Sequence, residues 1–84
     1  MAEHPSTFHL IIASVGETRF DAAALSATIP TSAGEITVLP RHEPLVATLK
    51  EGTITVKDTL GEQQTFAVES GVLEISGSRT VVLL

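Results

Sequence analysis

Apolar and polar residues alternate with a period of two along most of this chain. The alternation is clear in residues 25–29, 53–57 and 65–69, where every second side chain is apolar. A strand with one buried face has this period, because successive side chains point to opposite faces of a sheet. β-branched residues are frequent in these runs, as is typical of strands. The pattern predicts strands and no long helix.

Short segments that contain glycine separate the runs, at 15–17, 32–34, 51–52, 60–62 and 76–78. Many short strands at such intervals indicate an antiparallel sandwich or barrel. We therefore expect an all-β fold in which residues 1–84 form one domain, a flattened antiparallel β-sandwich or barrel of about ten short strands. Residues 21–25 include three consecutive alanines but are too few for an independent helix, so we expect a strand or a bulge there.

Two runs, 11–13 and 81–84, are apolar on both faces. Runs of this kind occur in central strands, or in strands that another subunit covers. The pattern alone leaves both possibilities open.

The charge and composition of the chain disfavour several classes of function. The net charge of −5, from ten acidic and five basic residues, disfavours binding to nucleic acid or to anionic lipid. No run approaches the roughly 20 apolar residues that span a bilayer, so we expect no direct membrane insertion. The first seven residues lack the basic and then apolar order of a signal peptide, and we expect a cytoplasmic bacterial protein.

Signatures of catalysis are missing from the sequence. It has no glycine-rich phosphate loop, no dinucleotide fingerprint and no cysteine, so we expect no cofactor and no catalytic residue. His42 and Glu43 begin like a zinc-protease motif, but Val46 stands where the second histidine would be and Pro44 would break the helix. A zinc site of His4, His9 and His42 is disfavoured because His4 lies in the terminal segment.

The most informative stretch is 34–52. Pro40 and Pro44 bracket a stiff corner, because each proline fixes its own φ and restricts the residue before it. The corner is expected to present Arg41, His42 and Glu43 outward. By itself it indicates either a rigid sandwich corner with no further role or a binding site.

This stretch resembles the N-terminal domain of the F-type ATP synthase epsilon subunit, which is the delta subunit in mitochondria. The matching motifs are Gly34-Glu35, the corner Pro40-Arg41-His42-Glu43-Pro44-Leu45, the turn Leu49-Lys50-Glu51-Gly52, and Ser70-Gly71-Val72-Leu73-Glu74-Ile75. The resemblance runs from about Phe8 to Leu84. Ser70 stands where the family has the first glycine of a pair, and the family's C-terminal helical hairpin is absent.

The resemblance implies a non-catalytic subunit of the rotor, or central stalk, of a proton-translocating ATP synthase. Its partners would be the gamma subunit and the c-ring, at the cytoplasmic face of the bacterial inner membrane. Glu35, Arg41, His42, Glu43, Pro44 and Leu45 are the expected subunit-interface residues. Glu35 would face the basic and polar ring loops, His42 would lie near the junction of ring and gamma, and the apolar strand faces would cover gamma. No ATP binding is expected, because the hairpin that binds ATP in some relatives is missing.

Two other classes of function remain open. The chain would be a stand-alone binding module if a ligand occupied the corner between Pro40 and Pro44. An enzyme that used His42 as a base would need an activating partner, and the sequence offers none.

Overall fold

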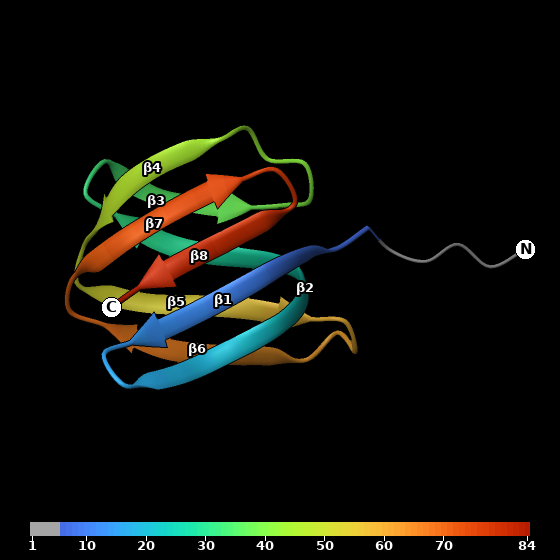
Figure 1. Ribbon diagram of the computed structural model, residues 1–84, viewed down its shortest axis with the longest axis horizontal. Helices are drawn as coiled ribbons and strands as arrows, with labels where there is room; N and C mark the ends of the chain where they lie inside the picture. The colour runs from blue at the N-terminus through green and yellow to red at the C-terminus, as the bar shows by residue number, and fades with distance from the viewer. Residues whose placement is uncertain (1–5) are drawn as a thin grey trace, which may run out of the picture.

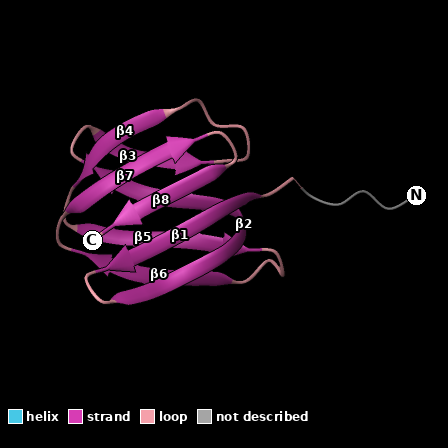
Figure 2. Cartoon of the chain, in the orientation of Figure 1, coloured by secondary structure: helices cyan, strands magenta, loops and turns pink. Residues whose placement is uncertain are grey.

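A computed structural model describes residues 6–84, and in that range the chain has strands and turns but no helix (Figure 2). The eight strands are β1 (Phe8–Ser14), β2 (Glu17–Thr31), β3 (Gly34–Val38), β4 (Leu45–Leu49), β5 (Gly52–Asp58), β6 (Gln63–Val68), β7 (Gly71–Ser76) and β8 (Arg79–Leu83). The predicted all-β class is confirmed.

The strands form two layers that share β2 (Figure 1). One layer has the order β4, β7, β8, β1 and the first half of β2; the other has β3, the second half of β2, β5 and β6. All pairings are antiparallel except that of β1 with β8. There are eight strands rather than about ten, and one reason is that β2 runs unbroken from one layer into the other.

A bulge in β2 marks the passage between the layers. The register against β5 shifts between Ala24 and Ser26, so Leu25 has no direct partner there. Ala24 and Ala27 are three residues apart and would face opposite sides of a regular strand, yet both are buried. Leu25 is only half buried. The expected strand or bulge is confirmed, whereas the simple alternation that placed Leu25 in phase with Ala27 was wrong. The extra residue of the bulge changes which face of the sheet the following side chains of β2 point to.

The core lies between the layers and consists of the apolar side chains that alternate inward on each strand. Its buried members are Phe8, Leu10, Ile12, Phe20, Ala24, Ala27, Ile29, Val38, Leu49, Ile54, Val56, Val68, Leu73, Ile75 and Val82. Phe20 of β2 packs edge-to-face on Phe66 of β6, with ring centroids 6.0 Å apart. This aromatic pair joins the two layers at an edge of the sandwich.

Buried polar groups have partners inside the fold. Thr31 is buried at the end of β2; its hydroxyl donates to the carbonyl of Gly34 and accepts from the amide of Ala33. No buried side-chain polar atom within residues 6–84 lacks a hydrogen bond. Ser70, at the family's glycine position, does not need a positive φ; among the described non-glycine residues only Arg41 has one.

Candidate functional site

The outer side of the layer formed by β4, β7, β8 and β1 carries several apolar side chains. On β7 and β8, Leu73, Ile75, Thr80 and Val82 are buried, so the residues between them point outward. Strand pairing then sets Val72 against Leu83, Leu83 against Ala13, and Val81 against Ile11. We call this set, with Val46 of β4, the apolar face: Ile11, Ala13, Val46, Val72, Val81 and Leu83.

The apolar face is open to solvent. Val46 is 70 % exposed, Val72 42 % and Leu83 55 %, while Ile11 and Val81 are half buried. Polar groups lie within it and beside it. Glu74 lies between Val46 and Val81, and His9 of β1 pairs with Asp21 of β2 through Nε2 and Oδ1. Large exposed apolar patches with polar residues at their rim mark sites of protein interaction.

The two runs that were apolar on both faces belong to this layer. β1 lies between β8 and β2, and β8 lies between β7 and β1, so both are central strands. Their second apolar side nevertheless faces outward and is not covered by any part of the chain that the structure describes. The strands are therefore central in their sheet, and cover of their outer side by another subunit stays a prediction.

The corner begins with a tight turn that fixes Arg41. The amide of His42 donates to the carbonyl of Leu39 at 3.2 Å, with Pro40 and Arg41 between them. Pro40 suits the second position of a type II turn, and the third position of that turn needs a positive φ, which glycine normally supplies. Arg41 occupies it with φ 66°. A side chain in this conformation costs about 1–3 kcal/mol, so the chain holds an arginine where its backbone favours glycine.

The residues of the corner differ in their exposure to solvent. Arg41, Glu43 and Pro44 are exposed, whereas His42 is half buried and its Nδ1–H donates to the carbonyl of Glu43 at 2.8 Å. Leu45 is the first residue of β4 and packs on the core, so only part of its side chain is accessible.

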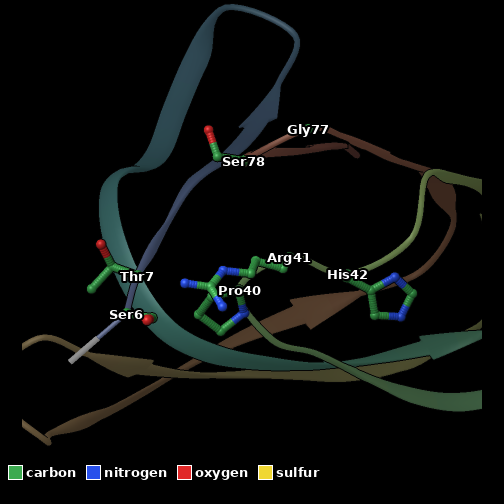
Figure 3. Close-up of a pocket in the computed structure, with 7 residues that line it drawn as sticks. All are labelled: Ser6, Thr7, Pro40, Arg41, His42, Gly77 and Ser78. Atoms are coloured by element: carbon green, nitrogen blue, oxygen red, sulfur yellow. The ribbon is translucent and has the colours of Figure 1, made fainter.

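A pocket of about 460 Å³ opens where this corner meets the start of β1 and the β7–β8 turn. It is lined by Ser6, Thr7, Pro40, Arg41, His42, Gly77 and Ser78. Figure 3 shows the Arg41 side chain extending across Pro40 toward Ser6 and Thr7, while the His42 ring points the other way. The pocket lies at one end of the layer that carries the apolar face, because Ser78 leads directly into β8.

Glu35 lies at the other end of the sandwich. It is the second residue of β3, pairs with Pro30, and is exposed beside Lys50 and Glu51 around a second pocket of about 420 Å³. The corner follows the far end of β3 (Figure 1). The structure thus separates Glu35 from Arg41, His42 and Glu43, which the sequence motif lists as neighbours.

The apolar face was only partly foreseen from the sequence. Runs 11–13 and 81–84 were identified, but Val46 and Val72 were not. Only the strand order shows that Val72 pairs with Leu83 and that Val46 lies on the next strand of the same layer, with Glu74 between it and Val81.

Other site types find little support within residues 6–84. No three histidine or acidic side chains come together as metal ligands there. His4 lies outside the described residues, while His9 and His42 are engaged with Asp21 and with the carbonyl of Glu43. No helix in this range is long and apolar enough to cross a membrane.

Residues 7–84 match the family described as ATP synthase, delta/epsilon chain, β-sandwich domain. The chain belongs to this family. The predicted recognition is confirmed, and the observed two-layer fold agrees with the family's description.

Relatives and solved structures agree with the assignment. The chain is 33 % identical over 78 residues to the ATP synthase epsilon chain of Alkalilimnicola ehrlichii, covering 93 % of this chain and 56 % of that protein. It is 43 % identical over 61 residues to that of Corynebacterium jeikeium, covering 71 % and 50 %. The chain therefore spans about half the length of these relatives.

Solved structures show the same fold. A chain in the Euglena gracilis mitochondrial ATP synthase matches with a TM-score of 0.87 at 21 % identity, covering 98 % of this chain and 52 % of that one. A chain in the central stalk and c-ring structure of the Tetrahymena thermophila mitochondrial ATP synthase matches with a TM-score of 0.77 at 9 % identity, covering 89 % and 60 %.

Proposed function

We propose that this epsilon-family sandwich is a non-catalytic part of the central stalk of a bacterial F-type ATP synthase. It would dock on the gamma subunit and on the c-ring and would couple proton transport to ATP synthesis. The complex would lie at the cytoplasmic face of the inner membrane, with this chain peripheral to the bilayer. The family assignment supports the complex, and the surface of the chain supports the docking.

The apolar face is the observation that carries the proposal. Three of its side chains are 42–70 % exposed, although the strands that carry them are hydrogen-bonded to their neighbours in the sheet. Burial of such side chains contributes roughly 25 cal/mol per Å² of apolar surface removed from water. A protein partner that lays an apolar surface across β4, β7, β8 and β1 would gain this energy, and gamma is the partner we assign to it.

The separation of Glu35 from the corner fits a bracket between two partners. Glu35 and Glu51 stand at one end of the sandwich, and the exposed corner stands at the other. Gamma would cover the apolar face and the corner residues Arg41, His42, Glu43, Pro44 and Leu45. His42 would then lie against gamma and not, as the resemblance implied, near the junction of gamma and the ring. The basic loops of the ring would meet Glu35.

A pull-down from detergent-solubilised membranes with a tagged chain tests this proposal. Recovery of gamma and the c subunit is the expected result. Recovery of neither, with the chain folded and monomeric, would leave the alternative of a stand-alone binding module that uses the corner between Pro40 and Pro44. That module would bind its ligand equally well in membranes that lack the synthase.

A further inference from the structure

We propose that the pocket at the Arg41 corner is a carboxylate-binding site. Arg41 provides its fixed positive charge, and the hydroxyls of Ser6, Thr7 and Ser78 line it with further donors. The guanidinium group presents two parallel N–H donors, a geometry that matches the two oxygens of a carboxylate.

The charge of the pocket is unusual for this chain. Acidic residues outnumber basic ones by ten to five, yet no acidic residue is among the described residues that line the pocket. Within residues 6–84, Arg41 forms no salt bridge, in contrast to Arg19, which lies 3.7 Å from Glu17. The guanidinium is therefore not neutralised by any acidic side chain of that range.

The backbone supplies an independent argument. Arg41 holds a positive φ of 66° at a turn position that glycine would fill without strain. Strained conformations of this kind cluster at functional sites, where a particular side chain is needed at a particular place. The strain is explained if the guanidinium itself has a role, since the turn does not need it.

A carboxylate fits better than a phosphate. One guanidinium balances one negative charge, whereas a phosphate dianion would leave excess negative charge on a protein whose net charge is already −5. We assign the carboxylate to an acidic side chain of the protein that covers the apolar face, because the pocket opens at the end of the same layer. Only this source rests on the proposed docking; the site itself does not.

The test is a titration of the isolated 84-residue chain with sodium acetate at constant ionic strength, balanced by chloride and followed by two-dimensional NMR. Saturable shifts of the Arg41 Nε–H signal and of the Gly77 and Ser78 amides are expected. Arg41→Gln should weaken binding about ten-fold or more, because it removes a charge-assisted hydrogen bond. The matched variant Arg19→Gln removes the same charge at the opposite end and should change binding by no more than about two-fold.

Arg41→Gly adds a second readout. It should lose acetate binding and also lower the unfolding constant by about five-fold, because glycine relieves the strained φ. Arg41→Gln retains a Cβ in the same conformation and should not gain this stability. These two results together separate a binding role of the side chain from a structural one.

Several results would overturn the site. They are shifts that do not saturate, equal loss in Arg41→Gln and Arg19→Gln, binding that survives Arg41→Gly, or loss of stability in Arg41→Gly. Inorganic phosphate that saturates the same signals at lower concentration than acetate would overturn the choice of a carboxylate. Recovery of gamma in the pull-down with no acetate site would refute this inference and leave the docking proposal standing.

Discussion

The backbone of Gly71 lies against the main-chain carbonyl of Leu83. A Cβ atom at position 71 would be 2.3 Å from that oxygen, and the φ of Gly71 is 153°. This close approach joins the start of β7 to the end of β8 and explains why the second glycine position of the family motif is retained here, whereas Ser70 fills the first without strain.

Gly71→Ala should therefore lower the free energy of unfolding by about 2–4 kcal/mol, through the unfavourable φ and the clash with backbone. Urea denaturation measures the change. Gly16→Ala is the matched control: Gly16 has φ 76°, but a Cβ there meets nothing within 4 Å. It should cost only about 1 kcal/mol, the strain alone. Equal losses in the two variants would show that the contact with Leu83 is unimportant.

Asp58 gives the fold a pH-dependent contribution in the β5–β6 turn. Its Oδ1 accepts from the amides of Leu60 at 2.9 Å and Glu62 at 3.0 Å, and its Oδ2 accepts from Gln64. The hydrogen bond from the Glu62 amide is the main cause that lowers the pKa of Asp58 below its ordinary value of 3.8, with a smaller opposing effect of burial.

A pKa that is lower in the folded state stabilises the fold above pH 3.8, and this contribution is lost as the pH falls through the folded value. Asp58→Asn should therefore be less stable than wild type at neutral pH, and the difference should shrink below about pH 4. Urea unfolding at a series of pH values measures it. A difference that stays constant from neutral to acid pH would contradict this origin.

Glu35 tests the end of the sandwich that we assign to the ring. An exposed ion pair contributes about 0–1 kcal/mol, so Glu35→Gln should weaken docking only slightly. Glu35→Lys sets like charges against the basic loops, a penalty of several kcal/mol at an interface. We expect it to lower proton-driven ATP synthesis in membrane vesicles and to leave ATP hydrolysis by the detached catalytic sector unchanged.

Glu62→Lys makes the same charge reversal in the β5–β6 turn, away from Glu35, and should leave synthesis near the wild-type rate. Undiminished synthesis in Glu35→Lys would mean that Glu35 does not face the ring. Collapse of hydrolysis in that variant would contradict the bracket as a whole.

Much of the fold was accessible from local pattern. Residues 53–57 alternate, and the structure buries Ile54 and Val56 as that period requires. The glycines also indicated turns correctly, since Gly16, Gly34, Gly61 and Gly77 lie in turns or at their ends and all have a positive φ. Both signals depend on the properties of neighbouring residues and survive without knowledge of the partners of a strand.

The candidate site depended on information that is not local. Val46 and Val72 join the apolar face only through the order β4, β7, β8, β1, which long-range pairing decides. Arg41 carries no sign of its positive φ, because nothing in its side chain favours that conformation. The separation of Glu35 from the corner could have been predicted from the sequence, because β3 has five residues and a strand rises about 3.3 Å per residue.

The central claim is that the apolar face docks on the stalk. Leu83 lies on this face and is 55 % exposed, whereas Leu60 is 82 % exposed in the β5–β6 turn, outside it. Leu83→Glu and Leu60→Glu are a matched pair, because each places a carboxylate at an exposed leucine. Each should change the free energy of unfolding by no more than about 1 kcal/mol.

Affinity of the two variants for purified gamma subunit is the most direct test. A charge left unpaired in an interface costs about 2–5 kcal/mol, so Leu83→Glu should raise the Kd at least about thirtyfold. Leu60→Glu should bind as the wild type does. Wild-type affinity in Leu83→Glu, or equal losses in both variants, would contradict docking through the apolar face.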